Sequence, residues 1–291
     1  MRLPCRIEPD RVAPPSEGGS EVVAARKQLK VPPGLSRGRS RGEERELASA
    51  AWLIEDMCQH VGVPDLHDTE MLDVGCGVKF TKLFINHDIP IERYVGLDVY
   101  GEMIEFLRRN VDDPRFEYHH MNLKNDLYNP SGDAFTEDIR LPLGHEAFDL
   151  ICLFSVFTHL PPPDYRTMLK VLRRHIRPNG RLFFTLYINE LTPGGHGLVD
   201  AWSKNYLVGR EDVLSARVAE RLEAGLPAIE PFIDLDPAKP LHCAVYSKEY
   251  AHELIEGTGW EVLSLSEPDA YIQHHFVCAP VPSSRDLRRA R

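Results

Sequence analysis

The chain has 291 residues with 34 Lys and Arg against 44 Asp and Glu, a formal net charge of −10, and 43% of its residues are hydrophobic. This composition supports a sizeable core and excludes wholesale disorder, and no apolar run reaches the roughly 18–20 residues that cross a bilayer. An acidic body repels a phosphate backbone, so general nucleic-acid binding is disfavoured as well.

The two ends of the chain differ in composition from the part between them. Residues 1–42 are rich in Pro, Gly, Ser and Arg, with more basic than acidic side chains, which predicts a disordered basic leader. We expect one domain over residues 43–280 and a basic tail over residues 281–291. The six cysteines lack the paired spacing of a zinc site or a disulfide framework, and the first residues lack the apolar stretch of a secretory signal. These features predict a reduced, cytoplasmic protein.

Apolar periodicity predicts alternating helices and strands through this domain. Helices are expected from Glu43, over 79–87, over 102–110, from Asp164, and from Ser247 to Glu256. Strands are expected over 70–74, 93–99, 115–119, 148–154, 181–188, 260–264 and 271–278, with a turn at residues 178–180. Such alternation favours a doubly wound α/β fold. A polar loop over 124–140 and an insertion over 189–245, with one expected helix over 211–224, interrupt the alternation.

The strongest motif is Asp73-Val74-Gly75-Cys76-Gly77, which follows the first strand and precedes a helix. Gly75 and Gly77 allow a sharp turn and a close approach by a ligand. A dinucleotide loop needs a third glycine where this chain has Phe80, and Asp73 repels a pyrophosphate. Both features favour a ligand that carries a positive charge and no phosphate, such as S-adenosylmethionine. The alternative for Asp73 is a carboxylate that fixes the turn by bonding backbone amides.

A second acidic residue completes this pattern. Asp98 ends the second strand 21 residues beyond Gly77, a position from which a carboxylate holds two ribose hydroxyls. The alternative for Asp98 is a helix cap before Glu102.

These motifs resemble those of the class I S-adenosylmethionine-dependent methyltransferases, over about residues 43–279. The resemblance implies a Rossmann-like, seven-stranded sheet of order 3-2-1-4-5-7-6 with the last strand antiparallel, and S-adenosyl-L-methionine as cofactor. It also implies a role for Asn122, which stands where the family has an acidic residue facing the adenine amino group. The residues expected to bind the cofactor are Asp73, Gly75, Cys76, Gly77, Asp98, Val99, Met103, Asn122, Leu123, Phe154 and Ser155.

One position departs from the family pattern. The family usually has a further glycine where this chain has Lys79. Either the close approach of the loop to the methionyl end is altered, or Lys79 pairs with the carboxylate of the cofactor. A solvated position on the helix surface is the third interpretation.

Methyl transfer is an in-line displacement, in which orientation alone supplies roughly 7–11 kcal/mol and a base is needed only for a nucleophile of high pKa. The candidate catalytic residues are His159, after the fourth strand, and Glu190 and His196, in a Gly-rich loop after the fifth. The insertion over 189–245 is expected to cover the acceptor pocket as a lid. The alternatives are a packing or capping role for His159 and a plain surface loop for the other two.

The sequence as a whole predicts a methyltransferase that acts on a small-molecule or glycan-type acceptor, without nucleic acid or membrane as partner. No spacing gathers three metal ligands, so no metal site is expected. A nicotinamide-dependent oxidoreductase is one rival, disfavoured by Phe80. A non-catalytic binding protein that kept the fold is the other, and Lys79 is the residue that favours it. Sequence reasoning leaves the oligomeric state open.

Overall fold

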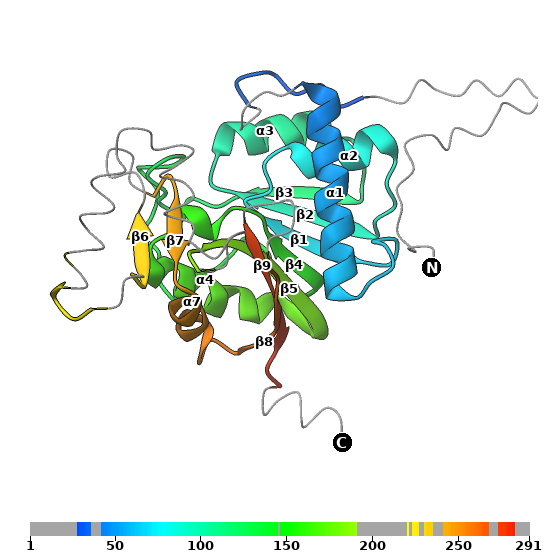
Figure 1. The fold of residues 1–291 in the computed structure, drawn as a ribbon. Coiled ribbons are helices and arrows are strands. Elements are labelled where there is room, and N and C mark those ends of the chain that lie inside the picture. The colour runs from blue at the N-terminus through cyan, green and yellow to red at the C-terminus, as the bar shows by residue number, and fades with distance from the viewer. Residues whose placement is uncertain are drawn as a thin grey trace, which may run out of the picture.

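The computed structural model describes residues 28–35, 42–144, 146–190, 220, 223–226, 230–234, 241–267 and 273–282. Within these residues nine strands form one sheet, and helices cover both of its faces (Figure 1). None of the described helices combines the length and the apolar character that crossing a membrane requires.

The strand order is the one expected. The principal strands are β1 (Glu70–Val74), β2 (Arg93–Asp98), β3 (Phe116–His120), β4 (Phe148–Leu153), β5 (Ile176–Ile188), β8 (Trp260–Leu265) and β9 (His274–Pro280). They run in the order β3-β2-β1-β4-β5-β9-β8, with β1 to β5 parallel. The last strand, β9, is antiparallel to both neighbours. The order 3-2-1-4-5-7-6 with an antiparallel last strand is therefore confirmed.

Two further strands extend the sheet within the expected insertion. The strands β6 (Phe232–Asp234) and β7 (Ala244–Tyr246) pair antiparallel, and β7 pairs parallel with the end of β5. Residues 191–219, with most of the helix expected over 211–224, lie outside the described residues.

The helices divide the buried side chains into two cores. On one face lie α1 (Glu43–Val61), α2 (Lys79–His87) and α3 (Gly101–Asn110), and on the other α4 (Pro162–Leu172) and α7 (Lys248–Ile255) (Figure 1). Two short 3-10 helices, η1 (Phe157–His159) and η2 (Arg173–His175), flank α4. Because both faces of the sheet are covered, its central strands β1 and β4 are buried along almost their whole length rather than at alternate residues.

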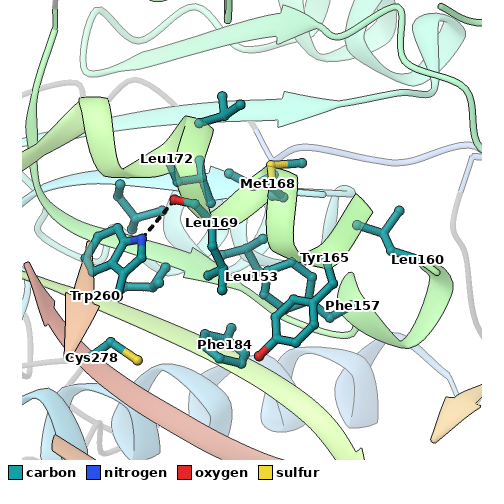
Figure 2. Packing of buried hydrophobic residues seen from close by; sticks show 14 of the residues in the cluster. Leu153, Phe157, Leu160, Tyr165, Met168, Leu169, Leu172, Phe184, Trp260 and Cys278 are labelled. Carbon is teal, nitrogen blue, oxygen red and sulfur yellow. Dashed lines mark hydrogen bonds between the residues drawn. The ribbon is translucent and has the colours of Figure 1, made fainter. Parts of the chain in front are cut away.

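Figure 2 shows the core between the sheet and α4. Aromatic rings fill it, with Phe157 edge-on to Phe184 at a centroid distance of 5.0 Å. Trp260 of β8 donates its indole N–H to the carbonyl oxygen of Leu169 at 2.8 Å. This hydrogen bond satisfies the one polar atom of a buried indole and ties α4 to the edge of the sheet.

The structure differs from the expected elements in two local features. Asp164 does not cap α4, which begins two residues earlier at Pro162 because proline is well suited to the first helical turn. The strand β5 runs through residues 178–180, where a turn was expected. A register shift in its pairing with β4 accommodates this segment, and a Cβ on Gly180 would lie 2.8 Å from the carbonyl oxygen of Asp149. Ser247 caps α7 as predicted, since its side chain accepts from the amide of Tyr250.

Part of the expected leader is packed against the domain. Leu29 is 4% exposed, and its amide donates to Oδ1 of Asn86 at 2.8 Å. Val31 and Leu35 pack on the same core as α1 and α2. The prediction of disorder over residues 1–42 is therefore wrong for 28–35, because three apolar side chains in this short stretch bury enough surface to order it. Residues 1–27 lie outside the described part of the chain.

Candidate active site

The glycine-rich loop between β1 and α2 has the tight geometry that its sequence indicates. Gly75 and Gly77 have φ angles of 73° and 53°, a region that favours glycine. A Cβ on Gly75 would also lie 2.5 Å from Cγ2 of Val156. The amides of Gly75 and Cys76 both donate to the carbonyl oxygen of Leu97, at 2.7 and 3.0 Å, which holds the loop against β2.

Asp98 connects this loop to the end of β2. Its Oδ2 accepts from the amide of Gly77 at 3.1 Å, and its Oδ1 accepts from the amide of Tyr100 at 3.0 Å. Asp98 does not cap α3, whose N-cap residue is Tyr100 and which has no side-chain cap hydrogen bond. The bond to Tyr100 instead holds the turn before this helix. A carboxylate has about four acceptor sites, so each oxygen retains capacity for a further donor. The geometry therefore fits two ribose hydroxyls as well as the local structural role.

Asp73 lies at the end of β1, held by side chains of the two flanking strands. Its Oδ2 accepts from the hydroxyl of Tyr94 at 2.6 Å, and its Oδ1 accepts from the thiol of Cys152 at 3.4 Å. Burial raises the pKa of this carboxyl to about 7. These partners are side chains, not the backbone amides of the turn that were offered as its alternative role.

A cavity of about 300 Å³ opens at the carboxyl ends of the strands, where doubly wound folds bind ligands. Most of the expected cofactor residues line it: Asp73, Gly75, Cys76, Gly77, Asp98, Val99, Leu123, Phe154 and Ser155. Ser155, at the end of β4, has a φ of 58°, which is uncommon for a residue with a side chain and often marks a functional site.

Two of the expected cofactor residues do not line this cavity. Met103 is fully buried in the core beneath α3, because the helical period turns its side chain toward the sheet. Asn122 is exposed, and its Oδ1 accepts from the side-chain amide of Asn129 at 3.2 Å. Its Nδ2 donates to Asp133 at 3.1 Å. Both polar atoms of the side chain that was expected to face the adenine therefore bond to residues of the loop over 124–140.

The two residues that distinguish this loop from a dinucleotide site both border the cavity. Phe80 packs edge-on against Phe154 at a centroid distance of 5.0 Å, where a dinucleotide loop needs the close approach of a glycine. Lys79 is half-buried rather than fully solvated, and its Nζ donates to Oγ of Ser49 in α1 at 2.9 Å. Burial lowers the pKa of Lys79, while Glu46 opposes this shift.

The three candidate catalytic residues have different positions. His159 lines the cavity, and its Nδ1 lies 3.0 Å from the carbonyl oxygen of Leu241. Glu190 does not line the cavity, and its carboxylate accepts from the amide of Lys248 at 2.9 and 3.1 Å. That contact stabilises the first turn of α7, so in this structure Glu190 has a structural role. His196 lies outside the described residues.

Several residues of the cavity wall have no motif of their own in the sequence. They are Leu35, Glu46, Leu53, Met121, Lys124, Asn125, Tyr128, Phe135, Leu160 and Met168. Most come from the packed leader, from α1 and from the loop over 124–140. The one available signal was the unusual length of that loop, because long loops in compact domains are often functional.

The chain is similar to known proteins both in a family comparison and in a comparison with solved structures. Residues 72–184 match the family described as "Methyltransferase domain". The fold is similar to that of an S-adenosylmethionine-dependent methyltransferase from Mesorhizobium loti, with 15% identity, 80% of this chain and 99% of that chain covered, and a TM-score of 0.46. It is also similar to the glycopeptide N-methyltransferase MtfA complexed with S-adenosyl-L-homocysteine, with 13% identity, 83% and 94% coverage, and a TM-score of 0.47.

The family match covers the glycine-rich loop, Asp98, the strands β2 to β4 and parts of β1 and β5. Residues 72–184 therefore form a methyltransferase domain, and the strand order is the one expected from the resemblance to the class I S-adenosylmethionine-dependent enzymes. This domain match supports the prediction that the cofactor is S-adenosyl-L-methionine. The nicotinamide-dependent rival is thereby set aside.

Proposed function

We propose that this methyltransferase acts on a small-molecule acceptor. The nucleophile of this acceptor is a hydroxyl or amine that must lose a proton, and His159 is the base that takes it. The observation that carries the proposal is the position of His159 in the wall of the cavity, with its ring orientation fixed by Leu241. A cavity of about 300 Å³ is at the lower end of small-ligand sites. The net charge of −10 disfavours a nucleic-acid acceptor.

The contact of His159 determines which of its nitrogens is basic. A carbonyl oxygen only accepts hydrogen bonds, so the contact with Leu241 places the proton on Nδ1. Nε2 then carries the lone pair. The ring of Tyr128 meets the imidazole edge-on at 5.9 Å, which further restricts its orientation. An imidazole held in this way takes the proton of a hydroxyl or amine as the nucleophile attacks the methyl carbon.

The cofactor supplies the activated methyl group, and residues of this chain position it. Asp98 binds the ribose hydroxyls, and the loop at Gly75 and Gly77 allows the backbone to approach the methionyl part. Lys79 pairs with the carboxylate of that part, since Lys79 lines the cavity and supplies an ammonium group there. The apolar residues of the cavity wall, including Leu160 and Met168, favour an acceptor with apolar surface.

Release of S-adenosyl-L-homocysteine, measured on a panel of small acceptors with hydroxyl, amine and carboxylate nucleophiles, tests the proposal. We expect turnover with a hydroxyl or amine acceptor, at a rate that falls below neutral pH as His159 is protonated. Turnover only on a protein or nucleic acid, or only on a carboxylate that needs no base, contradicts it.

A further inference from the structure

Three side chains from distant parts of the sequence meet where α1 packs on β9. Asp56 and His60 lie one turn apart near the end of α1, and His275 belongs to β9. Each offers one ligand atom, and these atoms all lie within 4.8 Å of one another. We propose that Asp56, His60 and His275 form a binding site for a divalent transition metal of the zinc type.

The separation of the candidate ligands suits a small tetrahedral ion. Nδ1 of His275 lies 3.4 Å from Oδ2 of Asp56. Two ligands that each lie about 2.0–2.1 Å from a tetrahedral zinc are about 3.4 Å apart, so this pair already has the required spacing. The rings of His60 and His275 converge on the same place, with centroids 4.0 Å apart at an angle of 63°.

The second nitrogen of His60 is oriented as it is in many metal sites. Its Nδ1 lies 2.7 Å from the backbone carbonyl oxygen of Asp56, which places the proton on Nδ1. Nε2 then carries the lone pair that binds a metal. A hydrogen bond from the other ring nitrogen to a backbone carbonyl is the outer-shell interaction that fixes ligating histidines.

The packing of His275 holds its ring in one orientation. The residue is 8% exposed, and its ring stacks on Phe183 at a centroid distance of 4.9 Å. Its Nε2 is buried and has no hydrogen-bond partner among the described residues. The nitrogen that faces Asp56 is Nδ1, so Nδ1 is the one available to a metal and Nε2 then carries the ring proton.

The cluster is accessible from solvent on one side and separated from the cavity on the other. The side chains of His60 and Asp56 are 33% and 21% exposed, which leaves an entry path and room for water as a fourth ligand. Phe154, which lines the cavity, contacts Phe183 at 5.2 Å, and these two rings lie between the cavity and His275. The metal therefore links α1 to β9, and it takes no part in methyl transfer.

Zinc binding to the full chain tests this site. The protein is stripped of metal, and Zn²⁺ affinity is measured in competition with a chromophoric chelator for the wild type and for Asp56→Asn, His60→Gln and His275→Gln. The matched control is His67→Gln, because His67 is an exposed histidine paired with Asp68 at 2.8 Å and belongs to no described cluster of three ligands. Thermal unfolding without metal shows whether each variant is folded.

We expect one tight equivalent of zinc in the wild type and in the His67 variant. Its affinity should fall more than about 10–100-fold in each of the three cluster variants, because loss of an outer-shell partner alone costs that much. Zinc should raise the melting temperature of the wild type and of the His67 variant, but not that of the cluster variants. Asp56→Asn and His60→Gln change partly exposed side chains, so they remain informative if His275→Gln does not fold. Equal zinc affinity in the wild type and these two variants, or no tight equivalent in the wild type, overturns the proposal.

Discussion

The hydroxyl of Tyr94 donates to Oδ2 of Asp73 at 2.6 Å, across the parallel pair β1 and β2. On the other side of β1, Cys152 of β4 directs its thiol at the second oxygen of the same carboxylate. Asp73 is 1% exposed, so the residue that begins the cofactor loop is held in the middle of the sheet. Its position depends on both neighbouring strands, and its ionisation depends on burial.

The first prediction concerns the stability of Asp73→Asn as a function of pH. Burial raises the pKa of Asp73 from 3.8 to about 7, so the folded state holds a proton that the unfolded state loses at lower pH. This group therefore destabilises the fold progressively as pH rises from about 4 to 7, by an amount on the order of 4 kcal/mol above pH 7. Asparagine is neutral throughout and still accepts from Tyr94. Urea unfolding should show the variant gaining stability relative to the wild type at pH 8 but not at pH 4, and an equal difference at both pH values would contradict the assignment.

The second prediction is that Asp98→Ala weakens S-adenosyl-L-homocysteine binding. A charged hydrogen bond contributes about 1.5–3 kcal/mol, so the loss of two ribose contacts should raise Kd by at least tenfold in calorimetry. Asp113→Ala is the matched control, because Asp113 pairs with Arg115 before β3 and does not line the cavity. If Asp98→Ala loses stability and keeps its cofactor affinity, Asp98 serves only to hold the glycine-rich loop and the turn before α3.

The fold was predictable because its signals are local and repeated. Each parallel strand is a short apolar run, as at Phe148–Leu153, and each following helix has an apolar face. The exceptions are at boundaries. Asp164 is a good capping residue by type, but Pro162 starts the helix earlier. The prediction of a disordered leader was partly wrong for a different reason. The composition was averaged over residues 1–42, and this average conceals the short apolar stretch that packs on the core.

The geometry of the candidate site was predictable where it depends on the backbone, whereas the hydrogen-bond partners of its side chains were not. Gly75, Gly77 and Asp98 follow from the turn and from the end of a strand. Asn122 is an example of a side chain whose partner the sequence does not reveal. Its position along the chain matches the family, but its side-chain oxygen accepts a hydrogen bond from Asn129. The expectation of no metal ligands rested on sequence spacing, whereas β9 brings His275 to α1 from more than 200 residues away, and spacing cannot show such a contact.

The third prediction tests the packed leader. Leu29→Ala removes most of a side chain that is 4% exposed and should cost about 2–5 kcal/mol, with the lower end favoured because the segment is short. The melting temperature should fall by roughly 2–4 °C for each kcal/mol. Leu226→Ala is the control, because Leu226 is 49% exposed and the same change should be nearly neutral there. An unchanged melting temperature for Leu29→Ala would show that residues 28–35 do not contribute to the core in solution.

The fourth prediction tests whether Lys79 binds the cofactor or only supports the structure of the loop. If its ammonium pairs with the carboxylate of the cofactor, Lys79→Ala should lower the affinity for S-adenosyl-L-homocysteine by about tenfold. This factor corresponds to the lower end of the free energy of a charged hydrogen bond, because Lys79 is half-exposed. Methylthioadenosine lacks the amino-acid part and should bind both proteins equally. Lys170→Ala, at a lysine paired with Glu137, should change neither affinity. Equal losses for the two ligands would mean that Lys79 only supports the shape of the loop through Ser49.

The last prediction concerns His159 as the base, and it depends on the pH profile more than on the rate. With the acceptor found in the panel, His159→Gln should lower kcat by about 10²–10⁴-fold and abolish the fall in rate between about pH 5 and 8. Its affinity for S-adenosyl-L-homocysteine should stay at the wild-type value, since the residues proposed to bind the cofactor are elsewhere in the cavity.

Two control variants distinguish the loss of a catalytic base in His159→Gln from a loss of structure. His252→Gln changes a histidine of α7 that does not line the cavity, and it should keep both the rate and the profile. Glu190→Ala removes the carboxylate that bonds the amide of Lys248, so it should lower the melting temperature and leave the shape of the profile unchanged. A His159 variant with reduced kcat and an unaltered pH profile would assign the imidazole to packing against Tyr128 and Leu241, because only the loss of a titrating base removes the pH dependence.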